Sequence, residues 1–253
     1  MLSRRDLDFL LHEWLDVQSL CDRARFASLR RDHFDAVLAQ AAQLARGCLA
    51  PANRQLDEQE PRLTAEDVWT PPVLSEVMAA VRDAGLLAVS QDRALGGMQL
   101  PVLIEKAVTA WLFAGSAAVT AYLYPSQAGS RLLQRWLPLL LKGRATCTFC
   151  ISEPQAGSSL SDIRTRAVRQ PDGSFRLYGN KMWIVGGDHA VTDNIVHLVL
   201  ARIEDDSGDI TPGVESLSLF LAPKYLPADP DPAEGAAERG ERNDIVAAGI
   251  YPQ

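Results

Sequence analysis

The hydrophobic pattern of the chain changes once, near Gly143, and this change limits the folds that it can adopt. Before Gly143 the apolar residues recur with a period of about 3.6, which predicts amphipathic helices. After it come short runs of β-branched and aromatic residues separated by turn residues, which predict strands. Because helices and strands are segregated rather than alternating, we predict the α+β class rather than a βαβ sheet.

The individual elements follow from the same patterns. Helices are expected over 6–20, 33–49, 72–86, 102–124 and 132–141, with Gly47 and Pro138 ending two of them and a polar connector over 51–72. Strands are expected over 146–152, 164–169, 174–178, 181–185, 195–203 and 216–222, and a further strand-like run starts at Asp244. The prediction is an all-α domain over 1–143 and an antiparallel β domain over 144–253, with an exposed loop over 223–243.

The composition is that of a globular protein, with 47% hydrophobic and 23% charged residues. The net charge of -7 argues against a nucleic-acid partner. The apolar stretch from Ala107 to Arg131 has the length of a membrane span. However, its Ser and Thr residues and Pro125 favour a buried helix. No secretory signal is visible at the N-terminus, so we expect a cytoplasmic protein without a membrane partner.

Four cysteines are present, at positions 21, 48, 147 and 150, and such sparse usage suggests a reducing compartment. Cys147 and Cys150 form a CxxC within an expected strand. Residues three apart on a strand point to opposite faces, so the two thiols are not expected to converge on a metal. No second CxxC or histidine pair completes a zinc site, and no metal site is predicted.

Residues 149–159 carry the richest chemistry, with the sequence Phe-Cys-Ile-Ser-Glu-Pro-Gln-Ala-Gly-Ser-Ser. The strand is expected to end at Ser152, where Pro154 makes the chain leave it. Gly157 allows the backbone to approach a ligand closely. Backbone N–H groups and the Ser158 hydroxyl suit an anion such as a pyrophosphate. A strand-to-loop turn without any ligand explains these residues equally well.

A second segment, residues 179–187, has the sequence Gly-Asn-Lys-Met-Trp-Ile-Val-Gly-Gly. Trp183 is expected on a strand flanked by turns, where its ring could stack on a planar group. Taken alone, a tryptophan in this position is more often part of the core.

Together the two segments resemble the acyl-CoA dehydrogenase family. That family carries an aromatic-x-x-Ser/Thr-Glu-Pro-x-Ala-Gly-Ser motif, here 149–158, and then Gly-x-Lys-x-Trp-Ile-Ser/Thr, here 179–185. Residues 10–14, 95–101 and 242–246 are similar to the branch that includes 3-methylmercaptopropionyl-CoA dehydrogenases. The resemblance covers nearly the whole chain.

The resemblance implies a helical domain followed by a β-barrel-like domain, with FAD between domains and an acyl-CoA thioester as substrate. The implied reaction is α,β-dehydrogenation, in which a base removes a proton and the flavin accepts a hydride. The implied cofactor-binding residues are Phe149, Ile151 and Ser152 beside the isoalloxazine ring, Gly157 and Ser158 at the pyrophosphate or the acyl-CoA chain, Trp183 on the flavin, and Ile184 and Val185 beside its N5 edge. Ser158 is thereby also a candidate substrate contact.

Two features depart from the family pattern. The family has Ser or Thr where this chain has Val185, so the hydroxyl that hydrogen-bonds the flavin is missing. The chain also lacks the C-terminal helical bundle that carries the glutamate base, and its barrel is incomplete. We therefore assign no catalytic residue and expect a partner chain carrying the bundle, or a homo-oligomer.

Three functions remain open from the sequence. The first is a dehydrogenase subunit that needs a second chain for its bundle and base. The second is a non-catalytic subunit that binds flavin, acyl-CoA or another protein. The third is an inactive truncated fragment.

Overall fold

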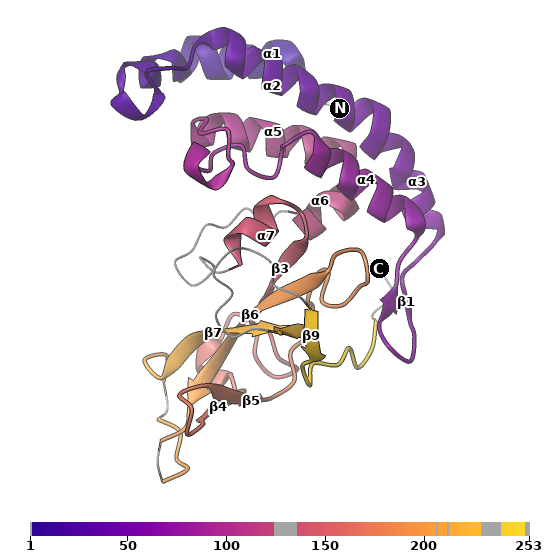
Figure 1. Cartoon of the computed structure of the whole chain (residues 1–253), viewed down its shortest axis with the longest axis vertical. Coiled ribbons are helices and arrows are strands. Elements are labelled where there is room, and N and C mark those ends of the chain that lie inside the picture. Colours follow the sequence, from indigo (N-terminus) through magenta and orange to yellow (C-terminus); the bar gives the residue numbers. More distant parts are fainter. Residues whose placement is uncertain (1, 124–135, 206, 212, 229–238, 251–253) are drawn as a thin grey trace.

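Helices form one half of the molecule and a curled sheet forms the other (Figure 1). The computed structural model describes residues 2–123, 136–205, 207–211, 213–228 and 239–250. The α+β class, with a helical N-terminal portion followed by a curled sheet, is therefore confirmed. Parts of four expected elements lie outside the described residues, in the segments 124–135, 229–238 and 251–253.

The elements have the following bounds. The helical ones are α1 (Arg4–Asp8), η1 (Phe9–Trp14), η2 (Val17–Asp22), η3 (Ala24–Phe26), α2 (Arg31–Leu44), η4 (Ala45–Leu49), α3 (Ala50–Glu58), α4 (Pro72–Asp83), η5 (Arg93–Leu95), α5 (Val102–Gly115), α6 (Ala117–Leu123), α7 (Leu137–Leu141) and η8 (Leu160–Asp162). The strands are β1 (Arg62–Leu63), β2 (Val68–Trp69), β3 (Ala145–Cys150), β4 (Arg166–Arg169), β5 (Phe175–Tyr178), β6 (Asn194–Ile203), β7 (Leu217–Pro223), β8 (Tyr225–Pro227) and β9 (Arg239–Arg242).

Elements α2, η4 and α3 follow one another without a break. The expectation that Gly47 ends this helix is wrong, and the polar connector expected from residue 51 begins as α3. The reason is that η4 is a π-helical turn, which inserts a residue and changes the hydrogen-bond register. Pro51 lies directly after that turn, in the first turn of α3, where a proline is tolerated.

Two other expected helices are divided. The apolar helix over 102–124 is α5 and α6, because Ser116 between them is extended, with φ of -156°. Its hydroxyl donates to Asn53 Oδ1 at 2.9 Å and accepts from the backbone of Val119 at 3.3 Å. The helix over 6–20 is divided at Asp16, whose φ of 42° is left-handed. Among the described residues, no helix is both long enough and apolar enough to cross a membrane.

Helix α7 begins where a break was expected. Pro138 lies in its first turn, so it starts this helix instead of interrupting one. Residues 132–135 of the expected helix lie outside the described part.

Helix α5 is the centre of the helical half and packs against α2 and η4. The largest fully buried side chains of this core are Phe34, Leu38, Leu49, Leu86, Ile104, Trp111 and Leu112. The closest approach is at Gly115, where a Cβ atom would lie 2.8 Å from Leu49 Cβ and 2.9 Å from the Ala45 carbonyl oxygen. Glycine at this position therefore sets how near the two helices come.

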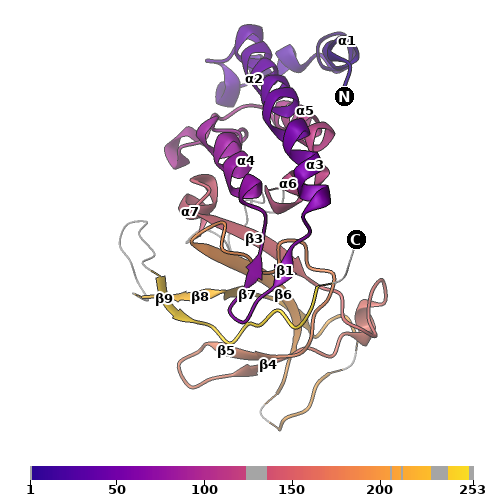
Figure 2. The same cartoon turned by 90° about the vertical axis from the view of Figure 1, so that its right-hand side faces the viewer.

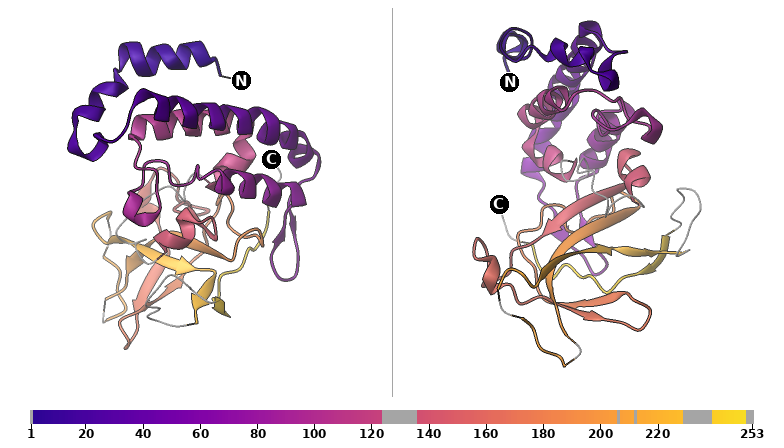
Figure 3. Two further views of the ribbon diagram at one scale, coloured as in Figure 1. Left: turned by 45° about the horizontal axis from the view of Figure 1, so that its top comes forward. Right: turned by 90° about the vertical axis from the view of Figure 1, so that its left-hand side faces the viewer.

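The hydrogen-bonded order in the sheet is β3-β6-β4-β5, and β7 also pairs with β6, outside this order. It curls below the helices (Figures 2 and 3). Strand β6 is parallel to β3 and β4 and antiparallel to β7, so the sheet is mixed and not purely antiparallel as expected. The reason is topological, because the β4–β5 hairpin lies between β3 and β6 in sequence and provides the crossover that a parallel pair requires.

The expected strands at 181–185 and 244–251 are not regular strands in the described residues. The first is a turn region in which Trp183 has a left-handed φ. An exposed loop was expected over 223–243. Instead, each described end of this segment contains a strand, because β8 pairs with β9. Lys224 is buried there, which its charge did not predict.

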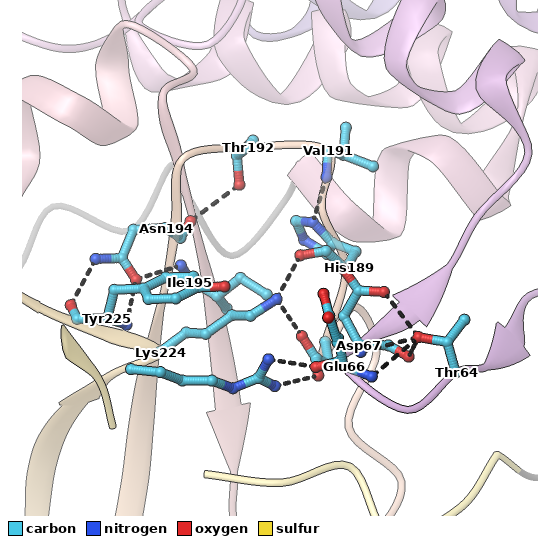
Figure 4. A network of polar contacts seen from close by, with 12 residues as sticks. Thr64, Glu66, Asp67, His189, Val191, Thr192, Asn194, Ile195, Lys224 and Tyr225 are labelled. Carbon is cyan, nitrogen blue, oxygen red and sulfur yellow. Dashed lines mark hydrogen bonds and ion pairs between the residues drawn. The ribbon is translucent and has the colours of Figure 1, made fainter. Parts of the chain in front are cut away.

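A buried charge cluster joins the sheet to the β1–β2 hairpin (Figure 4). Lys224 Nζ lies 2.5 Å from Asp188 Oδ1 and donates to the His189 carbonyl oxygen at 2.9 Å. Arg242 lies 3.2 Å from the other Asp188 oxygen and donates to the Glu66 carbonyl. Burial, and then the charge of Lys224, lower the pKa of His189 to about 4, so this imidazole is neutral at physiological pH.

The close approach at Gly115 makes a prediction about packing. Gly115→Ala should lower the free energy of unfolding by about 1–3 kcal/mol, because the added carbon forces α5 away from η4. Gly47→Ala is the matched control, since a Cβ there meets no atom within 4 Å. It should raise stability by up to about 1 kcal/mol. Urea unfolding of both variants measures the difference, and equal effects would contradict the packing argument.

Candidate functional site

The end of β3 places two apolar side chains on the outer surface of the sheet. Side chains alternate along a strand, so Phe149 and Ile151 point one way and Cys150 the other. Phe149 is 45% exposed and Ile151 is 36% exposed, whereas Cys150 is buried. An aromatic and an aliphatic side chain therefore lie beside each other on an open face.

Glu153 follows this strand, and its buried carboxylate holds three segments together. It accepts hydrogen bonds from the backbone N–H groups of Arg164 at 2.7 Å and Thr165 at 3.0 Å, and from the Thr165 hydroxyl. Lys181 Nζ lies 2.8 Å from Glu153 Oε1 and also donates to the Ile151 carbonyl at 3.0 Å. The two sequence motifs are thus joined by one ion pair.

The ionisation of Glu153 follows from these contacts. Burial alone would raise its pKa, but the hydrogen bonds from Lys181, Thr165 and the Arg164 backbone outweigh burial and lower the pKa to about 2. The carboxylate is therefore charged at physiological pH, and its oxygens are occupied. Such a group anchors a loop and is a poor proton acceptor.

The second motif lies directly against the end of β3, because the Met182 N–H donates to the Ser152 carbonyl at 3.0 Å. Trp183 follows with φ of 63°. This left-handed backbone is uncommon for a bulky residue and costs conformational energy. Its side chain is 64% exposed, so the alternative of a core tryptophan is wrong. Val185 is also on the surface, with 55% of its side chain exposed.

Ile184 differs from the other predicted cofactor residues. It is partly buried and packs against the small cluster of Cys150, Val199 and Ala222. Its side chain therefore lies on the same side as Cys150 and not on the face of Phe149. A contact between Ile184 and a ligand on that face would involve its backbone.

The loop after Glu153 is open around Gly157, and hydrogen bonds fix its C-terminal end. A Cβ added at Gly157 would meet no atom within 4 Å, and Ser158 is exposed. Further on, the buried guanidinium of Arg202 donates to the Ser161 carbonyl at 2.6 Å and to the Ile163 carbonyl at 2.7 Å. The loop tip thus has room for a ligand while its base is fixed.

Sequence reasoning missed Arg202 and did not assign a role to Lys181. The signal for Arg202 was its position as a single charged residue inside the apolar run 195–203. Burial of such a charge is unfavourable unless every donor is satisfied. The signal for Lys181 was its fixed place in the second motif. Neither pattern identifies the partner atoms.

The arrangement suits a planar aromatic ligand that also carries an anionic group. The exposed side chains of Phe149, Ile151 and Trp183 offer apolar and aromatic surface, and the open loop at Gly157 and Ser158 offers backbone and hydroxyl groups. These residues line neither the interior cavity below α4 nor the groove beside α2. The site is therefore an open face of the sheet.

The cysteine pair has a different character. Cys147 and Cys150 are both buried, and neither forms a disulfide. Burial, and then the neighbouring Cys150, raise the pKa of Cys147 to about 12. Buried thiols with a raised pKa are unreactive.

One group of side chains in the helical half has the composition of a metal site. Ligand atoms of Asp8, His12 and Asp35 lie within 4.8 Å of one another. Arg4 pairs with both carboxylates, at 2.7 Å and 3.1 Å. Its guanidinium takes the place that a cation would need, so we assign no metal to this group.

The comparisons with known proteins agree with this architecture. The model of the acyl-CoA dehydrogenase middle domain matches residues 148–235. A broad-specificity linear acyl-CoA dehydrogenase of Mycobacterium tuberculosis is 32% identical over 97% of this chain. The 3-methylmercaptopropionyl-CoA dehydrogenase of Ruegeria pomeroyi is 31% identical over 95%. The chain spans 40% and 41% of the lengths of these two relatives.

Solved structures share the fold. An acyl-CoA dehydrogenase of Bacillus anthracis, complexed with FAD, superposes with a TM-score of 0.61 over 82% of this chain and 34% of its own, at 18% identity. The butyryl-CoA dehydrogenase of Megasphaera elsdenii superposes with a TM-score of 0.57 over 77% of this chain and 49% of its own, at 20% identity.

The helical half, the curled sheet and the two joined motifs are those of a flavin-dependent dehydrogenase scaffold. The chain belongs to the acyl-CoA dehydrogenase family, and it corresponds to the N-terminal and middle portions of its relatives. The resemblance found in the sequence is thereby confirmed.

The depressed pKa of Glu153 predicts how stability changes with pH. Its folded-state pKa lies below the unfolded value, so its contribution is complete above about pH 4.5 and is lost as the pH falls towards 2. Relative to Glu153→Gln, the wild-type chain should be more stable by at most about 3 kcal/mol at pH 7. Urea unfolding across this range measures the gap, and a gap independent of pH would contradict the prediction.

Proposed function

We propose that this chain is the flavin-binding part of an acyl-CoA dehydrogenase, acting with FAD on an acyl-CoA thioester. The observations that carry the proposal are the exposed side chains of Phe149, Ile151 and Trp183 in the two joined motifs and the open loop at Gly157. We also propose that the catalytic base and the helical bundle come from residues outside 1–253, on a second chain or on more of the same polypeptide. A cytoplasmic location is part of the proposal.

The residues present fit FAD. Phe149, Ile151 and Trp183 are exposed and belong to two motifs that an ion pair joins, and aromatic side chains of this kind can contact a planar ring system. The strained backbone at Trp183 supports the same assignment, because strain of this kind is retained where function requires it. In this proposal Trp183 and Phe149 contact the ring system, and the Ser158 hydroxyl and the Gly157 backbone bind a phosphate or the acyl-CoA chain.

Bound FAD would supply the hydride acceptor for α,β-dehydrogenation. The chain's own residues would bind and orient it. The ion pair between Glu153 and Lys181 fixes the position of the second motif relative to β3, which a site of this kind needs for a defined geometry. Glu153 itself is excluded as the base because its hydrogen bonds hold it ionised and occupied.

A non-catalytic flavin-binding or acyl-CoA-binding subunit is the second candidate. The observation in its favour is Val185, which is 55% exposed on the proposed flavin side and has no hydroxyl to donate. A hydrogen bond lost there would change the reactivity of the flavin more than the fold. A fragment that binds no flavin is the third outcome of the experiment below.

The visible spectrum of the purified chain, with and without added FAD, tests the proposal. We expect retained flavin absorbance, and bleaching by an acyl-CoA once the missing bundle is supplied.

Trp183→Gly should weaken FAD binding by about tenfold while preserving or improving stability, because glycine adopts φ of 63° without strain. Trp14→Gly is the matched control, since Trp14 is 70% exposed in the N-terminal helical segment. No flavin binding by the wild type would overturn both ligand-binding functions, and binding without bleaching would leave the non-catalytic subunit.

Val185 allows a second measurement. Val185→Thr should tighten FAD binding about fivefold, because the new hydroxyl can add one hydrogen bond of about 1 kcal/mol. Val102→Thr on the surface of α5 is the control, with a side-chain exposure of 59%. Fluorescence titration with FAD measures both, and an equal change in the two variants would exclude a flavin contact at position 185.

A further inference from the structure

A groove of about 490 Å³ lies on the helical half, on other residues than the proposed flavin face. Its lining comes from α1, α2, η4 and α5, namely Arg4, Ala39, Ala42, Gln43, Arg46, Gly47 and Trp111. The volume is within the range of small-molecule sites, which is roughly 300–1,000 Å³. The groove follows the π-helical turn η4, and such turns occur frequently at functional sites.

The two arginines of the groove differ in their partners. Arg4 pairs with Asp8 and Asp35, which neutralise it. Arg46 has no carboxylate within 4.0 Å among the described residues, and its guanidinium carbon lies 4.9 Å from the centre of the Trp111 ring. The Arg46 guanidinium is thus held over an aromatic floor, with hydrogen-bond donors available to a ligand.

The floor of the groove contains an unusual polar atom. Trp111 is fully buried, and its Nε1 atom has no hydrogen-bond partner in the described part of the chain. A buried indole N–H normally finds an acceptor. The exposed Arg46 side chain places its guanidinium over this ring, so a ligand that draws the guanidinium away would remove one of the groups that cover the indole.

We propose that this groove binds a small organic carboxylate with a short apolar tail. Arg46 supplies a planar pair of donors that matches a carboxylate, and Trp111 Nε1–H supplies a further donor once Arg46 has moved. The tail lies against the small side chains of Ala39 and Ala42 and in the open space beside Gly47. The site is independent of the flavin function proposed above.

Ligand-observed NMR titration of the full 253-residue chain with sodium butyrate, at constant ionic strength, tests the proposal. Butyrate should bind, and the neutral butyramide should not. Arg46→Gln should weaken butyrate binding at least tenfold, since it removes a charge-assisted hydrogen bond. Arg54→Gln removes the same charge from an exposed arginine on α3 and should change nothing. Arg46→Lys should give an intermediate affinity.

Two further variants address the shape of the groove. Gly47→Leu should abolish binding by filling the groove, while urea unfolding reports an unchanged or higher stability. Trp111→Phe should weaken binding and leave the charge unchanged. Inorganic phosphate is the probe for a site that recognises charge alone. The proposal is overturned if butyrate does not bind, if phosphate competes equally, or if the Arg46 and Arg54 variants lose affinity equally.

Discussion

The ion pair between Glu153 and Lys181 is the contact on which the candidate site depends. It joins the end of β3 to a segment almost thirty positions later, and the same carboxylate accepts hydrogen bonds from the chain that enters β4. A buried carboxylate is unfavourable unless its oxygens are satisfied, and here each of them is. Because these segments meet at one side chain, the positions of the two motifs that carry Phe149 and Trp183 are fixed relative to each other.

Some of the site could be predicted from the sequence, and the reason is local geometry. The resemblance named Phe149 and Ile151 as site residues, and alternation along a strand explains why they share a face. The left-handed backbone of Trp183 was not predictable, because a run of β-branched and aromatic residues favours a strand. The preceding residues Lys181 and Met182 are instead held by tertiary contacts with Glu153 and Ser152. Arg202 illustrates the same limit, since its acceptors come from two loops that are distant in the sequence from each other.

The order of helices and strands was predictable because the period of the apolar residues is a property of each segment by itself. The pairing of strands was not, and the parallel register of β3 and β6 depends on a crossover that contains another hairpin. The predicted helix boundaries at Gly47 and Pro51 were wrong for a related reason. Both residues normally end a helix. Here the π-helical turn between α2 and α3 accommodates them, and the helix continues.

That turn has a consequence for the geometry of the whole molecule. A helix advances by about 100° of rotation per residue, so a π-helical insertion resets the direction in which everything after it points. Helix α3 leads into the β1–β2 hairpin, and this hairpin contacts the separate β8–β9 pair through the hydrogen bond from Arg242 to the Glu66 carbonyl. The extra residue in Ala45–Leu49 therefore rotates α3 about the helix axis, and this rotation sets the direction in which the β1–β2 hairpin leaves α3 and meets Arg242. A chain of the same composition with one residue fewer in this turn would send the hairpin to another side of the helical half.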